Sequence, residues 1–122
     1  MITKDILKGS HKEGFEADEV YEAYKIFFGT LVSGSRLRII NLLREGKKNV
    51  SEIMNVLDMD QTLVSHNLAR LKECGFVTSE VEGKYRYYNL NEKTIKPLME
   101  IIEAHMSYHC VHILRSAKER RK

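Results

Sequence analysis

The sequence predicts an α+β fold that is mostly helical, with the element order α-α-α-α-β-β-α. Three observations predict it. Apolar residues recur at helical spacing between residues 18 and 74. The stretch after Gly75 instead alternates in the manner of strands and is interrupted by a Glu-Gly-Lys turn. Helical spacing returns after Asn91 and continues almost to the C-terminus.

The composition is that of a globular protein. A chain of 122 residues is long enough for one domain with a hydrophobic core, and 43% apolar with 30% charged residues argues against disorder. No apolar run approaches the ~20 residues that span a bilayer, and no signal peptide is evident. We therefore expect a cytoplasmic protein with no membrane partner, in which Cys74 and Cys110 are reduced thiols. The net charge of +3 is too small to indicate a partner.

The first three helices are placed by their expected N-terminal residues. The first is expected to begin at Asp18, whose carboxylate suits an N-cap. The second begins at Ser33 or Ser35, and Gly46 suits the position just after its end. A third, short helix is expected to begin at Ser51 on residue type alone, because the neighbouring glutamates complete no capping box with it.

The fourth helix is predicted over residues 61 to 74, with Asp60 as its N-cap and Gly75 as its end. Its buried side consists of apolar residues three and four positions apart: Leu63 or Val64, Leu68 and Leu71. Its outward side is polar toward the N-terminus and carries no acidic residue before Glu73. We call this element the reading helix.

A β-hairpin and a long helix complete the chain. The segments FVTSEV and YRYYNL are rich in β-branched and aromatic residues, and the tip of the hairpin is expected at Glu82, Gly83 and Lys84. Asn91 is expected to cap one long helix over about 92 to 118, with Pro97 in its first turns or delaying its start. We divide the chain into an arm (1–17), a domain (18–118) and a basic tail (119–122).

Two short helices joined tightly and followed by a hairpin are the pattern of a winged helix-turn-helix, which reads DNA. The outward residues of the reading helix can form hydrogen bonds with base edges. Long cations on that helix (Arg70, Lys72) and on the wing can reach phosphates. The expected DNA-binding residues are Gln61, Thr62, Ser65, His66, Asn67, Arg70, Lys84 and Arg86. The alternative is a solvated amphipathic helix, which the hairpin directly after it disfavours.

The sequence also resembles a known family. The segments SRLRIINLL, DQTLVSHNLARLKECGFV and EGKYRYYNL look like the entry helix, recognition helix and wing of the ArsR/SmtB winged-helix repressors, over about residues 20 to 118. The resemblance implies a homodimer formed by the first and last helices, which binds a palindromic operator in double-stranded DNA and leaves it on a chemical signal. It also implies contacts with bases and phosphates from Gln61, Thr62, Ser65 and His66. One departure is Gly34-Ser35, where the family often has a proline.

Three histidines lie close together in the last predicted helix: His105, His109 and His112. At 100° per residue they lie within an arc of about 60°, beside the apolar stripe expected to form the dimer seam. Imidazoles there suit a transition metal ion of the zinc or nickel class, with groups of the partner completing a tetrahedron. The alternative is that these histidines are polar residues packed at the edge of the dimer.

Three histidines over two turns do not all reach one ion easily, so we expect a pair, His105 with His109 or His109 with His112. The family resemblance supports the second pair, because many members carry His-x-x-His late in the last helix. The earlier Asp-x-His of those members falls on Lys96 and Leu98, which cannot bind a metal, and their Cys-x-Cys before the reading helix is missing. Replacement ligands would come from His105, Glu100, Glu103 or His11.

Two other function classes compete with a repressor, and a thiol is an alternative signal. No His-Glu-x-x-His, Gly-rich phosphate loop or paired nucleophile and base is present, so we expect no enzyme. A protein-interaction module would carry apolar or acidic residues on the front of the reading helix, which this chain lacks. A thiol switch needs two cysteines with Cα atoms within about 7 Å, and Cys74 and Cys110 lie on different elements.

Overall fold

The computed structural model describes residues 14–120, so the predicted arm and tail lie largely outside the described residues, and the proposed division of the chain stays a prediction. The predicted winged helix-turn-helix order is confirmed, with one additional short strand and with the last helix divided in two. The elements are α2 (Ala17–Leu31), α3 (Gly34–Leu43), β1 (Lys48–Asn49), α4 (Val50–Leu57), α5 (Gln61–Glu73), β2 (Val77–Glu82), β3 (Tyr85–Leu90), α6 (Ile95–His109) and α7 (Val111–Arg120).

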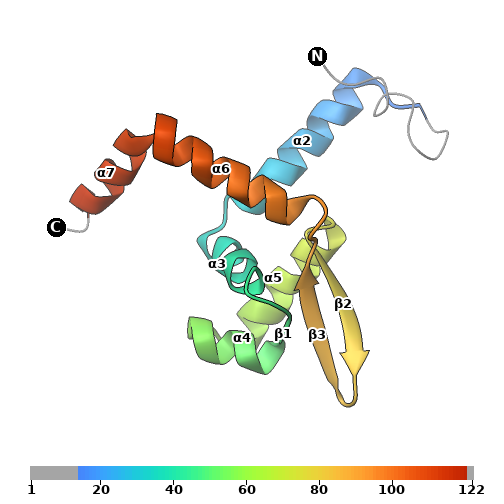
Figure 1. Cartoon of the computed structure of the whole chain (residues 1–122). Helices are drawn as coiled ribbons and strands as arrows, with labels where there is room; N and C mark the ends of the chain where they lie inside the picture. The colour runs from blue at the N-terminus through green and yellow to red at the C-terminus, as the bar shows by residue number, and fades with distance from the viewer. Residues whose placement is uncertain (1–13, 121–122) are drawn as a thin grey trace.

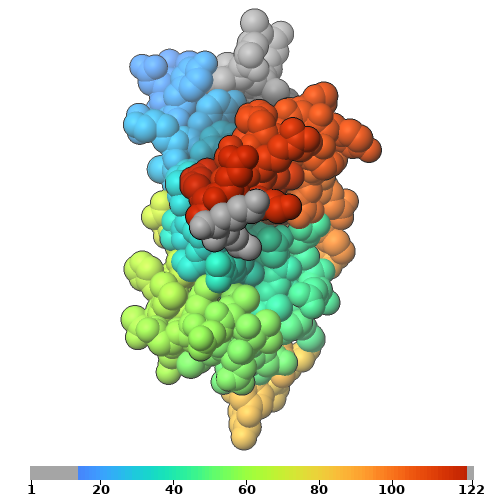
Figure 2. Space-filling view, turned by 90° about the vertical axis from the view of Figure 1, so that its left-hand side faces the viewer, coloured from blue at the N-terminus to red at the C-terminus, as the bar shows by residue number. Residues whose placement is uncertain are grey.

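The elements separate into two ends (Figure 1). Helices α3, α4 and α5 lie together, and the hairpin of β2 and β3 extends beside them with its tip pointing away. Helix α6 crosses above this group, and α2 projects from the opposite end to the hairpin tip (Figure 1). In the space-filling view the hairpin tip protrudes alone, far from α2 and α7 (Figure 2). The tip of the wing therefore lies apart from the first and last helices, whereas α5 contacts the end of α2.

Two predicted helix starts are confirmed. The hydroxyl of Ser33 accepts a hydrogen bond from the backbone N–H of Arg36 (3.3 Å) at the start of α3. Similarly, a carboxylate oxygen of Asp60 accepts from the N–H of Leu63 (2.8 Å) at the start of α5. These side chains satisfy N–H groups that a helix cannot pair internally, which stabilises each helix by about 1 kcal/mol.

Two other predicted starts are wrong. Helix α2 is capped by Glu16 rather than Asp18, and the N–H of Glu16 donates to the Glu19 carboxylate (2.9 Å). Helix α4 is capped by Asn49 rather than Ser51. Asn49 and Glu52 form a complete capping box, in which each side chain accepts the other's backbone N–H (2.9 and 3.0 Å). A box that begins at Ser51 would need Glu or Gln at position 54, which is Met54, whereas Asn49 has Glu52 three residues later.

The sheet has the strand order β1-β3-β2 and is antiparallel throughout. In the hairpin Val77 pairs with Leu90 and Glu82 with Tyr85, so the turn lies at Gly83 and Lys84, as predicted. Gly83 has a φ of 63°, which glycine adopts without steric cost. Strand β1 was not predicted, because its two residues are too few to show an alternating pattern.

The last helix is not continuous, and the prediction of one helix over 92 to 118 is wrong. The helix begins at Ile95, later than residue 92, and Pro97 lies in its first turn. It breaks at Cys110 into α6 and α7. Asn91 does not cap it directly, but its side chain accepts from the N–H groups of Lys93 and Thr94 in the preceding turn. The residues around the break are cysteine, valine, histidine and isoleucine, which all have weak helix propensity. A break in the helix therefore costs little free energy there.

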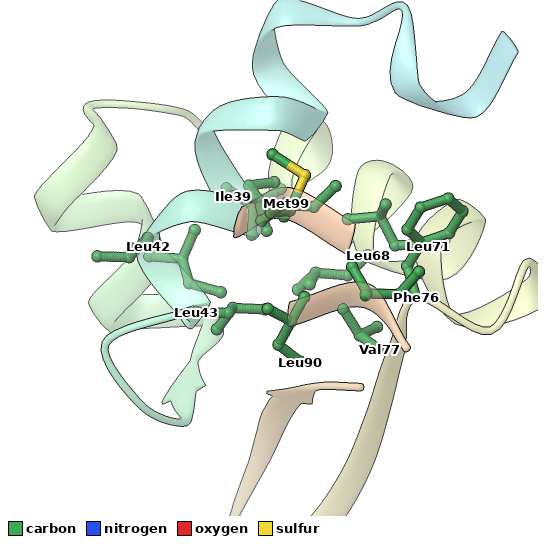
Figure 3. Packing of buried hydrophobic residues seen from close by; sticks show 13 residues of the cluster. Ile39, Leu42, Leu43, Leu68, Leu71, Phe76, Val77, Leu90 and Met99 are labelled. Atoms are coloured by element: carbon green, nitrogen blue, oxygen red, sulfur yellow. The ribbon is translucent and has the colours of Figure 1, made fainter. Parts of the chain in front are cut away.

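The core lies where α3, α5, α6 and the base of the hairpin meet (Figure 3). Leu68 and Leu71 of α5 point into it together with Phe76, which stacks on the ring of Phe27 from α2 (centroids 5.0 Å apart). Each fully buried side chain of this kind contributes about 1.5–3 kcal/mol. The cluster consists of Ile39, Ile40, Leu42, Leu43, Ile53, Val64, Leu68, Leu71, Phe76, Val77, Leu90, Ile95 and Met99.

Among residues 14–120, no single helix has both the length and the apolar character needed to cross a membrane. Helices α2 and α3 together have the length and the composition of a membrane span, but they are bent by 79° relative to each other.

Candidate nucleic-acid interface

The N-terminal half of α5 presents a polar face to solvent. Val64, Leu68 and Leu71 are fully buried and fix which side of the helix faces the core. Leu63, the alternative to Val64 in the sequence, is 41% exposed and lies at the edge. The exposed face carries Gln61, Thr62, Ser65 and His66, which span an arc of about 140° at 100° per residue. These four predicted residues are brought together on one surface.

Asn67 does not belong to this face, which corrects the prediction that it contacts DNA. Only 3% of Asn67 is exposed. Its Oδ1 accepts a hydrogen bond from Nη1 of Arg36 (3.3 Å), and its Nδ2 donates to the hydroxyl of Ser35 (3.0 Å). Both ends of the amide are therefore bonded inside the protein, and its burial keeps it from a base edge.

The reading helix and the wing meet through the hydroxyl of Ser79. This hydroxyl in β2 accepts from Nζ of Lys72 in α5 (3.0 Å) and from Nη1 of Arg86 in β3 (3.1 Å). Two cations from different elements are thereby held side by side, with their remaining donors toward solvent. Sequence reasoning named both cations but missed Ser79. Its signal was the register of the hairpin: Arg86 pairs with Val81, and Ser79 lies two residues from Val81, on the same face of the sheet.

The other two predicted phosphate contacts are exposed. Lys84 lies at the tip of the wing, with Nζ 5.4 Å from the centre of the Tyr85 ring. Arg70 lies on the flank of α5 toward α2, and its Nε donates to the hydroxyl of Thr30 (3.3 Å). Because only Nε of the guanidinium is bonded, the two Nη atoms of Arg70 can still donate hydrogen bonds to an anion.

Lys47 compensates the negative charge of the wing. Its Nζ forms ion pairs with Glu82 and, at 3.5 Å, with Glu80, and lies 5.4 Å from the centre of the Tyr87 ring. The hydrogen bond with Glu82 raises the pKa of Lys47 above its usual value. The two wing carboxylates are thus paired within the protein, which lowers the repulsion that they would exert on a polyanion. The partner of Lys47 lies over thirty residues away and was not found from the sequence.

The structure separates the three histidines that the sequence grouped. His105 and His109 lie one turn apart on α6 with ring centroids 5.1 Å apart, but His112 follows the break at Cys110 and lies on α7. In the described part of the chain, no group of three or more His, Cys, Asp or Glu residues is placed to hold a metal ion. The prediction of one shared face is wrong for His112, because it assumed a continuous helix.

One proposed replacement ligand, Glu103, is engaged elsewhere. Glu103 forms an ion pair with Arg44 of the segment after α3 (2.8 Å). At 100° per residue, Glu103 lies about 160° around α6 from His105. His11 lies outside the described residues. Cys74 and Cys110 are both free and half-buried, at the ends of α5 and α6.

A tight pair of helices, a second helix with a polar outward face, and a wing that places cations beside that face define a winged helix-turn-helix DNA-binding domain. Comparison with known proteins agrees: residues 33–79 match the model for bacterial regulatory proteins of the arsR family. The chain belongs to this arsR family of transcriptional regulators.

Relatives and solved structures support the assignment. An uncharacterized HTH-type transcriptional regulator of Methanocaldococcus jannaschii is 30% identical over 86 residues, which cover 70% of this chain and 97% of the relative. The cadmium resistance transcriptional regulatory protein CadC of Listeria innocua is 37% identical over 76 residues, or 62% of this chain and 64% of CadC. A homodimeric winged helix-turn-helix DNA-binding domain of Mycobacterium bovis superposes with a TM-score of 0.73 at 26% identity, covering 82% of this chain and 93% of that domain.

The match does not extend over the whole of every relative. It spans 39% of an HTH-type transcriptional regulator of Mycobacterium tuberculosis that is 29% identical over 89 residues.

Proposed function

We propose that this protein is a dimeric transcriptional repressor that reads a palindromic operator in double-stranded DNA with α5 and its wing. The observation that carries the proposal is the joining of the two elements at Ser79, where cations of the helix and of the wing lie side by side next to the polar face of α5. A repressor of this kind acts in the cytoplasm.

The residues divide into two roles. Gln61, Thr62, Ser65 and His66 lie at the end of α5 that enters a major groove in this fold, and their amide, hydroxyl and imidazole groups suit base edges. Arg70, Lys72, Lys84 and Arg86 carry long cationic side chains around this face and suit phosphates, which set affinity and register but not sequence preference.

Exposed apolar side chains support a dimer formed by the first and last helices. Large apolar residues project into solvent from α2, where Phe28 is 59% exposed, and from α6, where Tyr108 is 81% exposed. Monomeric proteins rarely expose extended apolar patches, so these faces suit an interface between two copies. The exposed residues are Tyr21, Tyr24, Ile26 and Phe28 on α2, Val32 directly after it, and Ile101 and Tyr108 on α6.

Selection from a random DNA pool, followed by titration of the selected duplex at several salt concentrations, tests the proposal. A repressor should select an inverted repeat and bind it with a Kd of about 10⁻⁸ M or tighter at physiological salt. The logarithm of the affinity should fall steeply with the logarithm of the salt concentration. Weak binding that is the same for all sequences would contradict the proposal, and binding as a monomer by sedimentation would contradict the dimer.

The pair of His105 and His109 points to a metal ion as the signal that releases the protein from its operator. His105 and His109 supply two neighbouring imidazoles at the edge of the proposed interface, which is half of a tetrahedral set for an ion of the zinc or nickel class. The symmetry of a dimer allows the partner subunit to supply the other half. The name of CadC, a cadmium resistance regulator, also points to a metal for a relative. Binding of the metal ion would then weaken binding of DNA, and the reverse, with a coupling free energy of about 1–3 kcal/mol.

Metal analysis of the purified dimer, followed by DNA-release assays with Zn²⁺, Ni²⁺, Co²⁺ and Cu⁺, tests this signal. One of these ions should weaken operator binding in the natural protein, and His109→Ala should abolish that response. Should no ion change the DNA affinity, or should His109→Ala leave the response intact, the metal signal is wrong. The chain would then be a regulator that answers to a thiol reagent, a protein or another signal.

A further inference from the structure

Arg36 lies at the junction of three helices. From the first turn of α3, its Nε donates to the backbone carbonyl of Thr30 (2.7 Å) and its Nη2 lies 3.4 Å from the carbonyl oxygen of Gly29. These carbonyls belong to the last turn of α2, where the carbonyl of Gly29 also accepts the backbone N–H of Val32 (3.3 Å). A cation at that position also interacts favourably with the helix dipole. Arg36 therefore caps the C-terminus of α2.

The same guanidinium extends to the reading helix. Its Nη1 donates to Oδ1 of Asn67 (3.3 Å), and the amide nitrogen of Asn67 donates to the hydroxyl of Ser35 (3.0 Å). The amide group is thus held at both ends by residues of α3. Asn67 follows His66 directly, and side chains of a helix keep a fixed angle of about 100° to their neighbours. Fixing Asn67 fixes the direction in which His66 leaves the helix.

Further contacts join the end of α2 to α5. The hydroxyl of Thr30, a fully buried residue, accepts from Nε of Arg70 (3.3 Å) and lies 3.3 Å from Sγ of Cys74. Asn67, Arg70 and Cys74 are spaced three and four residues apart, so they form one edge of α5. That whole edge is bonded, directly or through Arg36, to the last turn of α2.

We propose that Arg36 is a positioning residue for DNA recognition, which fixes the rotation of α5 against the end of α2 by bonding to Asn67 on one side and to Thr30 on the other. This inference rests on the proposed function, because it concerns the face of α5 assigned there to DNA. It makes DNA affinity sensitive to the position of α2, a helix of the proposed dimer interface. A guanidinium suits this role because its planar donors reach three acceptors at once.

Arg36→Lys keeps the charge but not this geometry, and Arg38→Lys is the matched control on the exposed side of the same helix. In folded protein, Arg36→Lys should weaken binding to the selected operator by at least about tenfold, which corresponds to about 1.4 kcal/mol, because the hydrogen bond to Asn67 is lost. The slope of log affinity against log salt concentration (the salt slope) should not change, and neither should the affinity for unrelated DNA, because the phosphate-binding cations remain. Arg38→Lys should bind as the natural protein does. An affinity of Arg36→Lys within twofold of the natural protein would overturn the proposal.

A double variant separates positioning from plain stability. Because Arg36 acts through Asn67, the variant with both Arg36→Lys and Asn67→Ala should bind the operator about as weakly as the weaker single variant. Losses that simply add would overturn the proposal. Should Arg36→Lys fail to fold, Ser35→Ala removes the second bond to Asn67, together with the hydrogen bond between the hydroxyls of Ser35 and Ser33 (3.0 Å). It should weaken operator binding about threefold, while the Arg38→Lys control does not. Unchanged affinity of Ser35→Ala would then overturn the inference.

Hydrogen exchange in the absence of DNA distinguishes this inference from the proposed function. Arg36→Lys should speed exchange of the backbone amides of residues 65–70 more than that of β3, because the bond to Asn67 is lost locally. Equal acceleration in both elements would indicate general destabilisation and overturn the positioning role. If the natural protein selects no operator, the proposed function fails, while the exchange pattern still decides whether Arg36 positions α5.

Discussion

The guanidinium of Arg44 lies 2.8 Å from the carboxylate of Glu103, so a residue just after α3 is bonded directly to α6. This ion pair joins the helix-turn-helix to the helix proposed to form the dimer interface. The hydrogen bond from Arg44 lowers the pKa of Glu103 below its ordinary value, and the same bond raises the pKa of Arg44. The pair is partly open to solvent, so its contribution to stability is small and weakens with salt.

Replacing Glu103 should make the free energy of unfolding fall less steeply as the pH is lowered; we call this decline the acid limb. Because the pKa of Glu103 is lower in the folded than in the unfolded chain, its contribution is fully present above the unfolded pKa, about 4.3, and is lost as the pH falls through the folded pKa. Urea unfolding between pH 3 and 7 should therefore show a shallower decline for Glu103→Gln. Glu92→Gln, an exposed carboxylate before α6, is the control. An unchanged acid limb in Glu103→Gln would contradict the assignment.

The parts of the fold that depend on neighbours in sequence were predictable. Asp60, Val64, Leu68 and Gly75 define the start, buried side and end of α5, and each acts within one or two turns of its own position. The hairpin tip at Gly83 is likewise local, since the turn requires a positive φ there. Helical and strand periodicity therefore indicated the helix-turn-helix and the wing.

The error at Asn67 arises because the role of this residue depends on a distant partner. Asn67 lies at the boundary between the buried and the exposed side of α5, where polarity alone suggests exposure. Its burial depends on Arg36, thirty-one positions earlier in the sequence. The grouping of His112 with His109 failed for a different reason: the break at Cys110 involves no glycine or proline that would have indicated it.

Truncation of the buried side of α5 should destabilise the whole domain. Leu68 is fully buried in the core, so Leu68→Ala should lower the free energy of unfolding by about 2–5 kcal/mol through lost burial and the cavity left behind. Leu63→Ala on the same helix is the control, because that side chain is 41% exposed and should cost within about 1 kcal/mol. Chemical denaturation measures both. Equal losses would show that the assignment of the two faces is wrong.

Removal of a wing cation should change the salt dependence of DNA binding. If Lys84 contacts a phosphate, Lys84→Ala should weaken binding to all sequences alike and reduce the slope of log affinity against log salt by about 1. Lys25→Ala on α2, far from the wing, removes the same charge and should leave the slope unchanged (Figure 1). A selective loss for one sequence, with the slope intact, would instead assign Lys84 to a base.

Replacement of His66 should weaken recognition of the operator and leave metal content unchanged. His66 is exposed on the front of α5, whereas the histidine pair proposed to bind a metal lies on α6. His66→Ala removes one base contact, so affinity for the selected operator should fall by about 1–3 kcal/mol while the salt slope and the binding of unrelated DNA stay as they were. Anisotropy titrations and metal analysis of the same preparation measure both properties. A loss of bound metal in His66→Ala, with operator affinity intact, would contradict the separation of the reading face from the signal site.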